Sequence, residues 1–126
     1  MTDPAGTLIA NADGIPIHTG GGGFAVRALL RDFGDRLNPG DVFILSDPYA
    51  AGGNHLPDWV IARPIFVGPR GAERLAGFCC NRAHQSDIGG GLAGTYNPEA
   101  TEIWHEGIRL PVMLAASARR MCERSH

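Results

Sequence analysis

Three side chains in this sequence have the types and spacing that a divalent metal ion requires. His55 and Asp58 lie three residues apart in a polar loop between two apolar runs, and His84 lies in a second polar segment. Two imidazoles and a carboxylate suit Zn²⁺, Mn²⁺ or Fe²⁺, and three protein ligands leave room for water. The alternative interpretation, that these polar residues only cap and bridge turns, stays open on spacing alone.

A predicted β-hairpin brings these three residues to one place. Its strands are expected at residues 59–67 and 75–80, joined by a turn at 68–71. A polar loop is expected to follow at residues 81–91. A hairpin returns the chain to its starting point, so the loop before its first strand and the loop after its second lie at the same end. We therefore expect His84 to lie near His55 and Asp58. Pro64 interrupts the first strand and predicts a bulge or a sheet edge there.

Three further residues are candidates to support the metal ligands. Asp47 and Asp87 lie in the same two loops and could each contact a ligating imidazole. An aspartate before a proline is also typical of a turn, and this second interpretation is favoured for Asp47. His18 is an isolated histidine, for which a structural role is the more common one. The glycine run 20–23 is interpreted as a flexible helix entry, because the GxxxxGK[ST] pattern of a phosphate-binding loop is absent.

The composition excludes several classes of function. Of the 126 residues, 44% are hydrophobic and 19% are charged, which is typical of a folded globular protein. The formal net charge is −2 and no basic run occurs, so nucleic acid is not an expected partner. The sequence has no lysine, which excludes a lysine nucleophile from this chain. Cys79, Cys80 and Cys122 lack CxxC spacing and are predicted to be reduced.

The sequence also predicts a cytoplasmic protein without a membrane segment. No apolar run approaches the roughly 20 residues needed to cross a bilayer. Residues 1–4 lack the basic and apolar regions of a signal peptide.

The expected fold is α+β, with a mainly antiparallel sheet and one or two helices. A helix at 24–37 has apolar residues at the spacing of one buried stripe, and Asn38, Pro39 and Gly40 end it. Besides the hairpin, short strands or extended pieces are expected at 7–10, 15–18 and 41–45, a short helix at 97–105, and an apolar segment at 108–114. The domain is expected to comprise residues 1–114, with an irregular tail at 115–126.

Several separate motifs occur together in this sequence. They are Asp41–Tyr49, Gly52–Asp58, Asn81–His84, Ala100–Ile103 and Glu106–Arg109. With these motifs the chain resembles the hydantoinase B/oxoprolinase B family, which includes N-methylhydantoinase B and the acetone and acetophenone carboxylase subunits of the same type. The resemblance extends from about residue 3 to residue 114, and it implies an N-terminal fragment of a larger domain.

The resemblance implies a function and a set of site residues. A partner A-type subunit binds ATP and phosphorylates the substrate, and the B part completes the hydrolysis of a cyclic, lactam-like amide. By motif position, His55, Asp58 and His84 hold a divalent metal ion. Two alternatives stay open: a subunit of a carboxylase that acts on a ketone, and a truncated, non-catalytic remnant.

Overall fold

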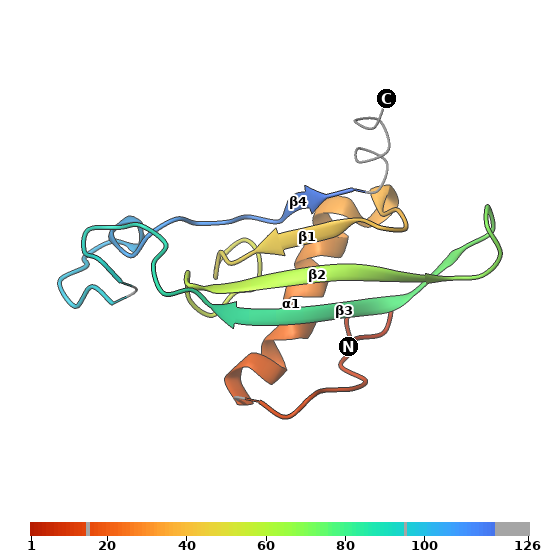
Figure 1. The fold of residues 1–126 in the computed structure, drawn as a ribbon, viewed down its shortest axis with the longest axis horizontal. Coiled ribbons are helices and arrows are strands. Elements are labelled where there is room, and N and C mark those ends of the chain that lie inside the picture. Colours follow the sequence, from red (N-terminus) through yellow and green to blue (C-terminus); the bar gives the residue numbers. More distant parts are fainter. Residues whose placement is uncertain (15, 95, 118–126) are drawn as a thin grey trace.

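The computed structural model describes residues 1–14, 16–94 and 96–117 of the chain. One long helix, α1 (Pro16–Phe33), lies across one face of a four-stranded sheet (Figure 1). The strands are β1 (Val42–Leu45), β2 (Asp58–Val67), β3 (Arg74–His84) and β4 (Met113–Ala116). Their order is β3-β2-β1-β4, and all three neighbouring pairs are antiparallel. This arrangement confirms the predicted fold class.

The hairpin formed by β2 and β3 is the longest pairing in the sheet. Its register runs from Asp58 opposite His84 to Val67 opposite Arg74. It shifts once, next to Ile65, so that Ala76 of β3 has no partner. The predicted bulge therefore lies beside Pro64. Because β1 pairs with β2 only between Val60 and Ala62, Pro64 has a strand on one side only, where its missing N–H is tolerated.

The core lies between α1 and the sheet. Ala25, Val26 and Leu29 of the helix are fully buried and pack in one cluster with Phe43 of β1 and Phe78 of β3. Each large side chain of this kind contributes about 1.5–3 kcal/mol when it is buried. This packing fixes α1 over the hairpin.

The helix begins earlier than the sequence predicts. Residues 15–18 were expected to be extended and the helix to begin at Phe24, but α1 starts at Pro16 and contains the glycine run. Proline is favoured at the first helical position because its missing N–H needs no partner there. Glycine is needed within the helix because a Cβ at Gly23 would lie 2.5 Å from the backbone oxygen of Gly6. Close contacts therefore outweigh the low helix propensity of glycine.

Other predicted boundaries also differ. α1 ends at Phe33 and is followed by the 3₁₀ turn η1 (Gly34–Arg36), and β3 continues to His84, where a loop was expected. The strand expected at 7–10 is reduced to an isolated bridge between Thr2 and Leu8. The helix expected at 97–105 is limited to the 3₁₀ turn η2 (Ile103–His105).

β4 extends through Ala116, across the domain limit expected at residue 114, and the expected tail from 118 onward, with Cys122, lies outside the described residues.

Across the described part of the chain, no helix combines the length and apolar character required to cross a bilayer.

Gly53 allows the loop between β1 and β2 to fold tightly on itself. A Cβ at this position would lie 2.0 Å from the backbone oxygen of Ser46, and backbone cannot move aside as a side chain can. Gly53→Ala is therefore expected to lower the free energy of unfolding by about 3 kcal/mol. Urea denaturation measures this change. The matched control is Gly34→Ala, whose Cβ meets nothing within 4 Å, and an equal loss in both variants would contradict the prediction.

Candidate metal centre

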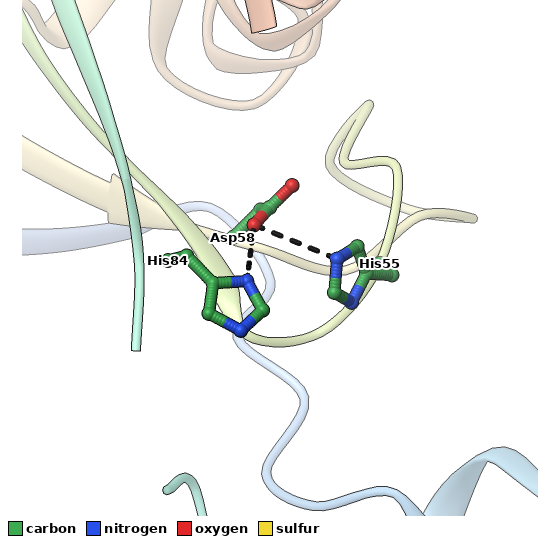
Figure 2. Close-up of side chains that lie close together, drawn as sticks. All are labelled: His55, Asp58 and His84. Carbon is green, nitrogen blue, oxygen red and sulfur yellow. Dashed lines mark hydrogen bonds and ion pairs between the residues drawn. The ribbon is translucent and has the colours of Figure 1, made fainter. Parts of the chain in front are cut away.

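The centre of the site is the carboxylate of Asp58, the first residue of β2. Its side chain is 1% exposed. One carboxylate oxygen, Oδ1, lies 3.0 Å from Nδ1 of His84 and 3.6 Å from Nε2 of His55 (Figure 2). The two imidazole rings are only 5.3 Å apart between centroids. The three side chains thus converge at one end of the hairpin, from the turn before β2, from β2 and from β3.

Backbone pairing fixes these positions. Asp58 and His84 are directly opposite in the β2–β3 ladder, and partners on antiparallel strands have Cβ atoms about 4.5–5.5 Å apart. His55 is held by the turn before β2, in which the backbone N–H of Asp58 donates to the His55 carbonyl at 3.2 Å. The Pro57 carbonyl accepts a hydrogen bond from the backbone N–H of Gln85 at 2.9 Å, which joins this turn to the end of β3.

The three side chains are close enough to one another to be candidate ligands of one divalent ion. One ligand atom from each of His55, Asp58 and His84 can be chosen so that all lie within 4.8 Å of one another. With metal–ligand bonds of about 2.0–2.1 Å, two ligands of a tetrahedral site are about 3.4 Å apart. The Oδ1 distances of 3.0 Å and 3.6 Å lie on either side of this value. The structure thus brings together the three residues predicted as ligands.

The surroundings of Asp58 favour its ionised form. Burial raises the pKa of the carboxyl group, but several groups oppose this effect. Hydrogen bonds from His84 and Asn54, and the charges of His55 and His18, together hold the pKa below its usual value. An ionised carboxylate is the form that binds a metal ion.

His18 contacts the other oxygen of the same carboxylate. Its Nε2 lies 2.9 Å from Oδ2 of Asp58, and its side chain is 23% exposed. His18 is in the first turn of α1, so the helix reaches the site through this residue. The two carboxylate oxygens are therefore divided, with Oδ2 facing His18 and Oδ1 facing His55 and His84. This contact is the one expected of a residue that orients a ligand.

Asp47 and Asp87 are engaged mainly within their own surroundings. Oδ1 of Asp47 accepts hydrogen bonds from the backbone N–H groups of Tyr49 and Ala50, and Oδ2 accepts two from Arg109. This pattern is the turn that its position before Pro48 indicates. Asp87 accepts hydrogen bonds from the backbone N–H groups of two glycines in its loop. The proposed support of the metal ligands by these two aspartates stays a prediction.

Two polar residues beside the site were not singled out by the sequence. Asn54 hydrogen-bonds to Asp58, and its Oδ1 accepts a hydrogen bond of 2.8 Å from Nη1 of Arg82. Both residues lie in the quoted motifs, next to or two positions from a histidine, and the hairpin register could have placed Arg82 on the same face as His84. A cavity of about 490 Å³ also borders the site, because His55 lines it together with Tyr96, Asn97, Pro98 and Glu106.

Comparison with known proteins identifies relatives of the chain. Over 107 residues it is 39% identical to 5-oxoprolinase 1 of Arabidopsis thaliana, covering 85% of this chain and 8% of that protein. Over 114 residues it is 37% identical to the caprolactamase subunit beta of Pseudomonas jessenii, covering 90% of this chain and 19% of that subunit. The chain thus spans less than a fifth of the length of these relatives.

A solved structure and a family model agree with these relatives. The crystal structure of the ATP-dependent caprolactamase from Pseudomonas jessenii superposes with a TM-score of 0.61 at 31% identity, over 80% of this chain and 17% of that one. The family model described as Hydantoinase B/oxoprolinase matches residues 1–125, and thus extends past residue 114. The chain therefore belongs to the hydantoinase B/oxoprolinase family.

Proposed function

We propose that this chain is the metal-holding, N-terminal portion of the B-type subunit of an ATP-dependent hydrolase that opens cyclic amides. The observation that carries this proposal is the convergence of His55 and His84 on the buried carboxylate of Asp58 in a chain of this family. Two of its relatives are named for reactions on cyclic amides, a 5-oxoprolinase and a caprolactamase, and the second is ATP-dependent by its description.

The proposed partner is an A-type subunit that binds ATP and phosphorylates the substrate. The relative from Pseudomonas jessenii is called subunit beta, which supports a division of the activity between two subunits. The sequence contains no lysine and lacks the P-loop pattern, so we assign ATP binding and phosphoryl transfer to the partner. A small cyclic amide is the proposed substrate.

The three proposed ligands would hold Zn²⁺, Mn²⁺ or Fe²⁺. When bound, such an ion polarises a carbonyl or phosphoryl oxygen and lowers the pKa of a bound water. The chain itself contributes position and access. Nε2 of His18 contacts Oδ2 of Asp58, whereas the side chains of His55 and His84 are 40% and 41% exposed. The exposed side of the cluster is thus open to a substrate.

Metal content tests the site directly. Wild-type protein dialysed against Zn²⁺, Mn²⁺ or Fe²⁺ and then freed of excess metal is expected to retain about one equivalent. His55→Ala and His84→Ala are each expected to retain much less, because each variant leaves two ligands. His105→Ala is a matched control, since His105 belongs to η2 and not to the cluster. Equal metal content in the wild type and both cluster variants would refute the site.

Activity tests the reaction. With an added A-type subunit and ATP, the chain in its native assembly is expected to support ring opening of 5-oxoproline or caprolactam, measured as the amino acid formed. Bicarbonate dependence with a ketone substrate would instead assign the chain to a carboxylase. Metal binding without either reaction would contradict the proposed activity while leaving the metal site intact.

A further inference from the structure

Arg82 carries hydrogen-bond donors that the described part of the chain does not satisfy. It lies on β3 opposite Val60, two residues before His84 and on the same face of the sheet. Its Nη1 donates to Asn54, but Nε and Nη2 are buried and have no hydrogen-bond partner among the described residues. Burying a charged group without acceptors is costly, so a guanidinium in this setting indicates a missing acceptor.

The same arginine borders a cavity of about 620 Å³. His18 also lines this cavity, and its Nε2 contacts Oδ2 of Asp58, so the cavity lies next to the proposed metal centre. Leu8 and Val60 give it apolar surface, and Asp13, the one acidic side chain among the described residues of its lining, is exposed. A volume of this size suits a small molecule with an apolar ring and a few polar groups.

We propose that Arg82 binds an oxyanion of the substrate, a carboxylate or a phosphoryl group, in this cavity. The identity of the anion as part of a substrate rests on the proposed function, but the binding of an oxyanion does not. A guanidinium presents its N–H groups as a planar fork that matches two oxygens of such a group. Nε and Nη2 are neighbouring donors of that fork, and neither has an acceptor among the described residues.

Gly21 of α1 provides the space in which the guanidinium lies. A Cβ at this position would approach Nη2 of Arg82 to 2.5 Å and Nη1 to 2.6 Å. The glycine therefore lets the guanidinium lie against the helix, beside the cavity that Arg82 borders. Glycine is unfavourable inside a helix, but at position 21 it leaves the space that the Arg82 guanidinium occupies.

Titration of metal-free protein with three probes tests the inference. The probes are inorganic phosphate, 5-oxoproline and 2-pyrrolidinone, which has the same lactam ring without the carboxylate. Chelator-treated protein excludes binding through a metal, and NMR or calorimetry measures the dissociation constants. We expect phosphate or 5-oxoproline to bind at least tenfold more tightly than 2-pyrrolidinone. Tighter binding of phosphate assigns a phosphoryl group to the cavity, and tighter binding of 5-oxoproline assigns a carboxylate.

Variants locate the binding at Arg82. Arg82→Gln is expected to abolish anion binding, whereas Arg63→Gln, on an exposed position of β2, is expected to retain it. Unchanged anion affinity in Arg82→Gln, or equal binding of 5-oxoproline and 2-pyrrolidinone without phosphate binding, would overturn the inference.

A second pair of variants keeps the test valid if Arg82→Gln does not fold. Gly21→Ala is expected to displace the guanidinium and change the anion affinity at least threefold, whereas Gly20→Ala, whose Cβ meets nothing within 4 Å, is expected to leave it unchanged. Equal affinities in this pair would contradict the role of Arg82. His84→Ala separates the two proposals, because it is expected to lose metal and retain anion binding.

Discussion

Asp58→Asn is expected to lower the affinity of the chain for a divalent metal ion by at least about 100-fold. The substitution keeps the size of the side chain but removes the charge that His55 and His84 share at Oδ1. Loss of a residue that only orients a ligand already costs about 10–100-fold, so loss of a ligand should reach the upper end of that range or exceed it. Competition with a chromophoric chelator measures the affinity.

Asp87→Asn is the matched control for this variant. Asp87 is exposed, and its carboxylate accepts hydrogen bonds from the backbone N–H groups of Gly89 and Gly94. The same change of charge should therefore leave the metal affinity within about threefold of the wild type. If Asp58→Asn and the control bind metal equally well, the cluster is a set of turn contacts, which is the alternative that residue spacing left open.

Arg109→Ala is expected to lower the free energy of unfolding by about 3 kcal/mol, because it leaves a buried carboxylate without its cation. The side chain of Asp47 is 5% exposed, and Nη2 of Arg109 lies 2.6 Å from its Oδ2. The pair joins the loop after β1 to the segment before β4. Its guanidinium also lies 4.4 Å from the centre of the Trp104 ring, a contact that the alanine variant loses as well. Chemical denaturation at neutral pH measures the change.

The difference between this variant and the wild type should depend on pH. Burial raises the pKa of Asp47, but the hydrogen bonds from Arg109, Ala50 and Tyr49 outweigh it, so the pKa lies below its usual value. A lowered carboxyl pKa stabilises the folded state above the unfolded pKa of about 3.9, and this stabilisation is lost as the pH falls through the folded pKa. The difference should therefore be complete at pH 6 and shrink below pH 4. Arg70→Ala, in the exposed turn after β2, should cost little at either pH.

β1 and the β2–β3 hairpin could be predicted from the sequence, but β4 and the start of the helix could not. β1 and the hairpin follow from apolar runs bounded by glycine and proline, and these signals are local. The glycine run indicates a loop by local propensity. Its place inside α1 depends on contacts with Gly6 and Arg82, which lie 17 and more residues away and leave no mark in the local pattern.

The same distinction applies to the site. The proximity of His55, Asp58 and His84 follows from hairpin geometry alone, although His84 belongs to β3 and not to the loop after it. The contact between His18 and Asp58 could not be derived in this way. It requires α1 to begin at Pro16 and to cross the sheet near the end of β2, which tertiary packing decides.

The opposition of Asp58 and His84 at one end of the β2–β3 ladder has a consequence for how this region can vary among related proteins. Residues 68–73 connect the strands at the far end, so insertions and deletions there are expected to be tolerated without altering the spacing of the two side chains. An insertion or deletion of one residue between Asp58 and Ala62 would instead move the side chain of Asp58 to the opposite face of the sheet relative to the rest of β2, because side chains alternate between the two faces along a strand. Natural length variation should therefore be confined to the distal turn and the unpaired position at Ala76.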